Sequence, residues 1–102
     1  MNIGALYVVK KYFWLLFPTK EIAADTNCEA AAAIHRASLA AESADYWSRQ
    51  LKCEVTYFSR DSIIVFLEEE GKYKKVLTSD GMIGWTWFIE SYNECFEEIL
   101  NK

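Results

Sequence analysis

The feature that most constrains the fold is a series of short β-type segments between residues 54 and 88, separated by turn signals. Residues 63–67 form a continuous apolar run, which is typical of a buried central strand. Residues 78–81 contain Asp-Gly, a dipeptide that accepts the positive φ angles of a tight hairpin turn. The segments on either side of that turn, 73–77 and 82–88, are then expected to pair. The pattern predicts an antiparallel β-meander of three or four strands.

Three further signals refine this meander. Residues 59–62 are a turn candidate after a first strand over 54–58. Glu68, Glu69 and Glu70 precede Gly71, so we expect a charged loop here, with the glycine supplying a difficult backbone angle. Gly84 inside the last strand predicts a bulge or a close contact with another part of the chain.

The N-terminal segment 3–17 is rich in β-branched and aromatic residues and should be extended. Lys10 and Lys11 interrupt it, and neither residue favours a tight turn. One long bent strand, or two strands meeting at a bulge, would both satisfy this pattern. Pro18 ends the segment because it cannot donate to a strand ladder.

Two helices are expected. Thr26 and Glu29 have the spacing of a capping box, and an alanine-rich stretch without Gly or Pro follows, which predicts an amphipathic helix over about 27–51. Its predicted packing face consists of Ala30, Ala33, Ala37, Ala40, Ala44, Trp47 and Leu51. A short C-terminal helix is expected over about 92–100. The predicted fold class is therefore α+β: a small, strongly bent antiparallel sheet or barrel with helices, in one domain over residues 1–102.

Composition excludes several classes of function. The chain has 102 residues, which suits one domain, and a formal net charge of −4, which argues against a nucleic-acid-binding surface. Cys28, Cys53 and Cys95 lack C-x-x-C spacing, so they predict reduced thiols in a cytoplasmic protein and neither disulfides nor a zinc site. No apolar stretch is long enough for a membrane span.

Catalysis finds little support in the sequence. The single histidine, His35, falls on the polar face of the predicted helix, and no nucleophile elbow, P-loop or dinucleotide-binding motif is present. We therefore expect neither an enzyme nor a cofactor or metal site. A cysteine-dependent enzyme stays as the less favoured alternative, because a thiol and the imidazole could meet in the fold.

The C-terminal half resembles the SH3-like barrel family, including its bacterial relatives. The similarity lies in the order of a turn and strand at 61–67, an acidic stretch, a strand at 71–76, and a hairpin with a Gly-Trp strand at 79–85. Residues 5–7, Ala-Leu-Tyr, are similar to the start of the family's Ala-Leu-Tyr-Asp-Tyr motif. Together these stretches cover about half of the chain, within residues 54–92 and 5–7.

The resemblance implies an aromatic binding groove. By their match to motif positions, its candidates are Tyr7, Tyr73, Trp85 and Tyr92, bordered by the acidic side chains of Glu68, Glu69 and Glu70. The chain departs from the family at four points. Val9 stands at the second tyrosine position, Tyr73 stands where the family has a tryptophan, no proline follows Trp85, and more than 30 residues replace a short loop. Polyproline binding is therefore not expected.

The function indicated by the sequence is a non-catalytic interaction module that binds a protein or peptide, or a second copy of itself. Rigid aromatic side chains supply large contact areas at low entropic cost, which favours this reading. An accessory or inhibitor protein that docks on an enzyme is the alternative. The two readings differ mainly in the partner.

Overall fold

The computed structural model describes residues 2–25, 40–87 and 90–99; for Asp25, Ala40 and residues 90–92 it describes the backbone alone. The described chain is α+β with mostly antiparallel strands, as predicted. Its elements are β1 Leu6–Val9, β2 Phe13–Leu16, α1 Lys20–Asp25, α3 Ala40–Leu51, β3 Thr56–Ser59, β4 Ile63–Glu70, β5 Tyr73–Thr78, β6 Ile83–Trp87, the 3₁₀ helix η1 Glu90–Cys95 and β7 Phe96–Glu98.

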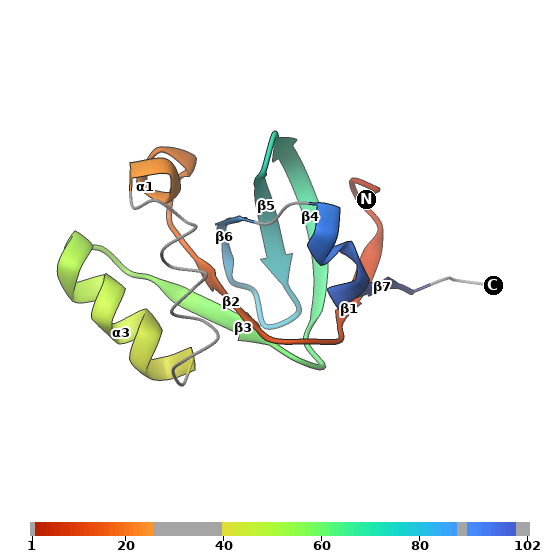
Figure 1. Ribbon diagram of the computed structural model, residues 1–102, viewed down its shortest axis with the longest axis horizontal. Helices are drawn as coiled ribbons and strands as arrows, with labels where there is room; N and C mark the ends of the chain where they lie inside the picture. Colours follow the sequence, from red (N-terminus) through yellow and green to blue (C-terminus); the bar gives the residue numbers. More distant parts are fainter. Residues whose placement is uncertain (1, 26–39, 88–89, 100–102) are drawn as a thin grey trace.

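The strands form two sheets. The larger has the order β6-β5-β4-β1-β7, and the smaller consists of β2 and β3 (Figure 1). Helices α1 and α3 lie at one end of the molecule, beyond β2 and β3, while β1, β7 and both termini lie toward the other end (Figure 1). The smaller sheet therefore stands between the helices and the larger sheet.

The predicted meander is present as β4, β5 and β6, which pair antiparallel in chain order. The turn at 78–81 is confirmed: Thr78 N–H donates to the Met82 carbonyl at 2.8 Å, and Gly81 has a φ of 90°. Asp80 accepts a hydrogen bond from the Thr78 hydroxyl, which stabilises the same turn. The local turn chemistry thus determines this hairpin, as expected from the sequence.

The prediction of a charged loop at residues 68–71 is wrong. Glu68, Glu69 and Glu70 belong to β4, and only Gly71 and Lys72 form the turn, with Gly71 at a φ of 59°. The three glutamates pair along the register with Lys75, Lys74 and Tyr73 of β5, after a bulge between Phe66 and Glu68. Cross-strand pairs of opposite charge stabilise a sheet, so the acidic residues extend the strand and do not end it.

The N-terminal extended segment is divided into two strands that belong to different sheets. β1 pairs with β4 and β7, whereas β2 pairs with β3. Tyr12, which follows Lys10 and Lys11, has a φ of 65°, and this left-handed residue redirects the chain between the sheets. β2 ends before Pro18, as predicted, and Phe17 makes an isolated bridge to Trp85 of β6.

The long predicted helix is described only from Ala40 onward, and its first part, with Ala30, Ala33, Ala37 and His35, lies outside the described residues. α3 ends at Leu51, as predicted. Lys52 then adopts a φ of 54°, and Cys53 N–H donates to the Ser48 carbonyl at 3.3 Å. This is the pattern of an α-helix that ends in a single residue of left-handed conformation. Ala44 is buried, whereas Glu42, Asp45 and Arg49 are exposed, so the described part has the predicted polarity.

A short helix, α1, was not predicted. Thr19 caps it: the hydroxyl oxygen accepts a hydrogen bond from Ile22 N–H at 3.1 Å. The signal was present in the sequence, since a Thr directly after Pro18 is a favourable helix start.

The predicted C-terminal helix is wrong. Residues 90–95 form a 3₁₀ helix, and residues 96–98 form β7, which pairs with β1. The pairing is reinforced where Lys10 N–H donates to the Cys95 carbonyl at 2.7 Å and Ile99 N–H donates to the Leu6 carbonyl at 2.8 Å. The free edge of β1 satisfies its backbone groups with this segment, and this tertiary pairing overrides the helical pattern of the apolar residues.

Two hydrophobic clusters form the core, one on each side of β2. The first combines the larger sheet with one face of β2 and β3, and includes Tyr7, Val9, Trp14, Leu16, Phe58, Ile64, Phe66, Val76, Cys95 and Phe96. The second joins the other face of β2 to the helices, and includes Leu15, Phe17, Ala23, Ala44, Val55 and Trp87, with Trp47, Leu51, Tyr73 and Trp85 packed at its border. Residues alternate between the clusters along β2, as period-2 geometry requires.

Gly84 makes the close contact that the sequence predicted. A Cβ atom at this position would lie 2.9 Å from Leu16 Cβ and 3.0 Å from the Phe17 carbonyl oxygen. The absence of a side chain therefore allows β6 to approach the end of β2. At the same place, Phe17 and Trp85 exchange backbone hydrogen bonds of 2.8 and 2.7 Å.

Candidate functional site

The aromatic candidates named from the sequence do not form one groove. Tyr7 is only 6% exposed and lies in the first cluster, where its ring meets Phe66 edge-on at a centroid distance of 5.2 Å. Its hydroxyl accepts a hydrogen bond from Asn2 N–H at 2.8 Å. Tyr7 is thus an interior residue, because its register partner Ile64 points to the buried face of the sheet.

Tyr73 and Trp85 lie elsewhere. Both are half-buried, project from the opposite face of the larger sheet, and pack against the second cluster. The register places both rings on the same face of the sheet. Tyr73 pairs with Trp87 and Lys75 pairs with Trp85, and residues two apart on one strand share a face. Tyr92 falls outside the described side chains. The predicted groove is therefore corrected: the strand alternation that places Tyr7 inside the core separates it from Tyr73 and Trp85.

Each of the three candidate glutamates is already paired with a lysine of this chain. The distances from lysine Nζ to a carboxylate oxygen are 3.6 Å for Lys75 and Glu68 and 3.6 Å for Lys74 and Glu69. For Lys20 of α1 and Glu70 the distance is 2.7 Å. The hydrogen bond from Lys20 to Glu70 raises the pKa of Lys20 above its ordinary value. These pairs hold β4 to β5 and α1 to β4.

The described residues instead enclose a cleft beside β3, with a volume of about 520 Å³. Its walls include five consecutive residues, 55–59. A cleft over one face of a strand would be lined by alternate residues, so a consecutive lining shows that the cleft follows the backbone edge of β3. The rest of the described lining comes from Ala44 of α3, from Ser62, and from Ser79, Asp80 and Met82 at the β5–β6 turn.

The edge of β3 that faces this cleft is unpaired at one residue. Ser59 exchanges hydrogen bonds with Ser62, through Ser59 N–H to the Ser62 hydroxyl at 3.3 Å and Ser62 N–H to the Ser59 carbonyl at 3.0 Å. Val55 N–H donates to the Ser48 hydroxyl at 2.9 Å. Alternate residues of an antiparallel strand direct their backbone groups to the same side, so Tyr57, midway between these two, also points away from β2. Its N–H and C=O have no hydrogen-bond partner among the described residues.

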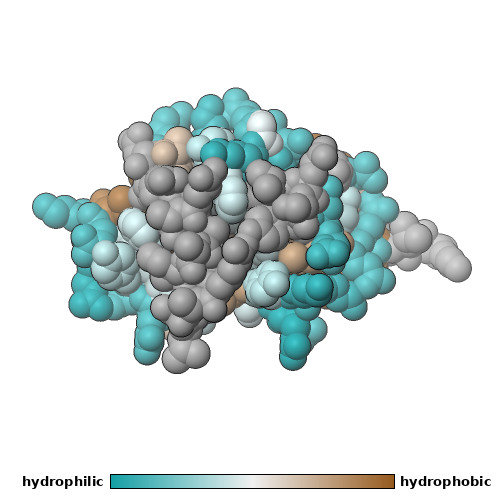
Figure 2. Space-filling view, viewed as in Figure 1, coloured by the Kyte–Doolittle hydropathy of each residue, from teal (hydrophilic) through white to brown (hydrophobic). Residues whose placement is uncertain are grey.

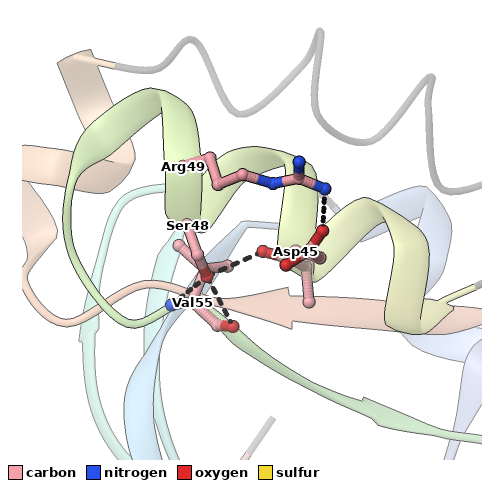
Figure 3. A network of polar contacts seen from close by, with 5 residues as sticks. Asp45, Ser48, Arg49 and Val55 are labelled. Atoms are coloured by element: carbon pink, nitrogen blue, oxygen red, sulfur yellow. Dashed lines mark hydrogen bonds and ion pairs between the residues drawn. The ribbon is translucent and has the colours of Figure 1, made fainter.

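Ser48 fixes the end of this edge to α3. Its hydroxyl donates to the Ala44 carbonyl at 2.8 Å and accepts from Val55 N–H, and Figure 3 shows this contact beside the exposed Asp45–Arg49 pair. On the edge that faces away from β2, the described partners at the start of β3 are thus side-chain hydrogen bonds.

A second hollow of about 380 Å³ adjoins the cleft and shares Thr56 and Met82 with it. The charged residues among the described lining of both hollows are Asp80 and Glu54, and both are acidic and exposed. Neither forms an ion pair with a described residue. The cleft therefore combines apolar walls, serine hydroxyls and negative charge. On the side drawn in Figure 2, the described surface is mostly hydrophilic, with small hydrophobic areas.

Other chemistry is sparse in the described part of the chain. Cys53 is half-buried and Cys95 is buried, and both carry free thiols, while Cys28 lies outside the description. Among residues 2–25, 40–87 and 90–99, no cluster of histidine, cysteine and acidic side chains could hold a metal ion. No described helix has the length and apolar character needed to cross a membrane.

Comparison of the chain with protein-family models, with curated proteins and with solved structures finds no significant match.

Sequence reasoning missed this cleft for a specific reason. It forms where β3, the 60–62 turn and the β5–β6 turn meet, and the lining of the β5–β6 turn begins 20 residues after β3 ends. One local signal was available: the serines at 59 and 62 bracket a turn and can bond the backbone of a strand end.

Proposed function

We propose that this protein is a non-catalytic interaction module that binds a protein or peptide segment in the cleft beside β3. The observation that carries the proposal is the backbone of Tyr57, which has no hydrogen-bond partner in the described part of the chain and faces a cleft of about 520 Å³. Exposed strand edges are ready-made templates for pairing with another chain. The half-buried side chains of Tyr57 and Met82 in the lining would contribute apolar contact area.

The proposal includes an SH3-like architecture. Two features support it: β4, β5 and β6 cover the residues that carry the resemblance, and β1, which contains the Leu-Tyr match, pairs with β4. On this proposal, β2, β3 and the helices constitute the segment that replaces a short loop of the family. The free thiols of Cys53 and Cys95 are compatible with a reducing, cytoplasmic setting.

The test is to select binders from a random seven-residue peptide library and to fill the cleft in a variant. Ser79 is exposed on the rim, so Ser79→Tyr would place a ring over the opening without burying it. We expect selected peptides to lose at least tenfold in affinity for this variant, measured by calorimetry. Gln50→Tyr, which adds the same ring at an exposed position of α3 outside the cleft, is the matched control and should bind normally.

Two results would contradict the proposal. One is a library that yields no binding peptide for the folded wild-type protein. The other is equal binding by Ser79→Tyr, Gln50→Tyr and wild type, which would place the bound peptide on another surface.

A further inference from the structure

We infer that the segment bound in the cleft is an extended, basic one, which adds as a strand to the edge of β3 at Tyr57. This inference rests on the proposed function and specifies how the same site recognises its ligand. It is carried by two features of the cleft: the direction of the Tyr57 backbone groups and the sign of the charges on the lining.

The backbone geometry limits the contact to a short stretch. Ser62 already forms hydrogen bonds with the outward-facing N–H and C=O of Ser59. The hydroxyl of Ser48 already accepts a hydrogen bond from the N–H of Val55. On this edge, with the described residues as the possible partners, Tyr57 is left to exchange two hydrogen bonds with a neighbouring strand. The residue of the ligand opposite Tyr57 would therefore supply one essential N–H group, while the N–H groups of its two neighbours would point away from β3.

The electrostatics favour a cationic ligand. Asp80 in the β5–β6 turn and Glu54 before β3 are the charged residues among the described lining, and the whole chain has a net charge of −4. Asp80 keeps a carboxylate oxygen free, because the Thr78 hydroxyl donates to the other one. By contrast, Glu68, Glu69 and Glu70 are neutralised by lysines of the chain itself. Lys or Arg side chains of the ligand would pair with Asp80 and Glu54 at the two hollows.

The apolar walls suit a strand as well. Phe58 belongs to the first core cluster and Tyr57 packs against the second, so the edge of β3 is flanked by both clusters. Met82 lines both hollows between the two acidic residues. A strand placed along β3 directs alternate side chains to its two faces, so apolar residues can contact these walls while basic residues reach the acidic ends.

The experiment uses peptides selected from the random seven-residue library, re-synthesised with a methyl group on one backbone nitrogen at a time. We expect the selected peptides to be enriched in Lys and Arg. N-methylation at a single central position should raise the dissociation constant about tenfold, and methylation at its two neighbours should have little effect.

Charge variants complete the test. Asp80→Asn retains the acceptor for Thr78, and this variant and Glu54→Gln should each weaken binding about threefold at low salt, with a smaller effect at 0.5 M salt. Glu97→Gln on β7, which removes one negative charge outside the cleft, is the control and should bind as the wild type does.

The outcomes separate this inference from the proposed function. If Ser79→Tyr abolishes binding but the peptides are neutral, acidic or proline-rich, or tolerate methylation at every position, the cleft binds peptides and the basic-strand inference is overturned. If no peptide binds, both fail.

Discussion

The β4–β5–β6 meander and the smaller sheet of β2 and β3 are both antiparallel, but their outer edges have different hydrogen-bond partners. β4 is covered by β1, and β6 exchanges two backbone hydrogen bonds with Phe17. In the smaller sheet, β2 receives that same contact through Phe17, whereas β3 is held by Ser48 and Ser62, and Tyr57 has no backbone partner among the described residues. The comparison teaches that the meander is closed by main-chain pairing, while the smaller sheet keeps one backbone position beside a cleft that no other described residue pairs with.

The larger sheet should be the more costly unit to disturb. Phe66 of β4 is 1% exposed and makes edge-on ring contacts with Tyr7 at 5.2 Å and Phe96 at 5.7 Å. Phe66→Ala is expected to lower the free energy of unfolding by about 3–5 kcal/mol, because it removes a buried ring and leaves a cavity. Urea denaturation measures this change. Tyr46→Ala, at a half-exposed ring of α3, is the control and should cost less than about 1 kcal/mol. Equal losses of unfolding free energy in the two variants would contradict the expectation that the core of the larger sheet contributes more to stability than the exposed face of α3.

The contact that joins the two units depends on Gly84. Gly84→Ala would bring a methyl group within 2.9 Å of Leu16 Cβ, so we expect a loss of about 1–3 kcal/mol from the free energy of unfolding. Faster amide exchange at Phe17 and Trp85 should accompany the loss, because their mutual hydrogen bonds lie at the same contact. An unchanged melting temperature would mean that β2 and β6 do not approach this closely. Ile83→Ala, at the adjacent exposed position, serves as the control.

The side-chain support of β3 is tested by Ser48→Ala. This change removes the acceptor of Val55 N–H and is expected to cost about 1–2 kcal/mol, measured by thermal or chemical denaturation. Asp45→Ala breaks the exposed pair with Arg49 on the same helix and should cost about 0.5 kcal/mol or less. If the two variants are equally stable, the Ser48 contact does not anchor the start of β3.

The smallest expected effect concerns the pair between Lys20 and Glu70, which links α1 to the meander. Because Glu70 raises the pKa of Lys20 in the folded state, its stabilisation is fully present below the ordinary value of 10.5 and is lost as the pH rises through the folded-state value. Glu70→Gln should remove this dependence. Unfolding measured between pH 9 and pH 11.5 should therefore show a steeper loss for the wild type than for the variant. Parallel curves would contradict the link.

The two units also differ in how well the sequence predicts them. The meander turns are encoded locally, and the Asp80-Gly81 turn was located correctly, whereas at the β4–β5 turn only the positive φ of Gly71 was anticipated. The strand boundary at residues 68–70 was missed because cross-strand pairing with Lys74 and Lys75 overrides the preference of acidic residues for loops. The C-terminal strand was missed for a related reason, since its conformation follows from the free edge of β1.

The candidate site was the least predictable part. Resemblance to a family's motif positions selected aromatic residues, and strand alternation then placed Tyr7 in the interior and Tyr73 and Trp85 on the other face. The cleft depends on the meeting of three segments, and its key group is a main-chain amide, which any residue type except proline would supply at position 57. Side-chain patterns carry no information about such a group.

Residue-resolved amide hydrogen exchange at Tyr57 tests the central claim most directly. In the free protein, Tyr57 N–H should exchange much faster than Phe58 N–H, because Phe58 lies opposite Trp14 of β2 in the smaller sheet. Addition of a selected peptide should slow the exchange of Tyr57 strongly and leave Phe58 almost unchanged. Slow exchange of Tyr57 without peptide, or protection by the peptide at other residues while Tyr57 stays fast, would contradict the account.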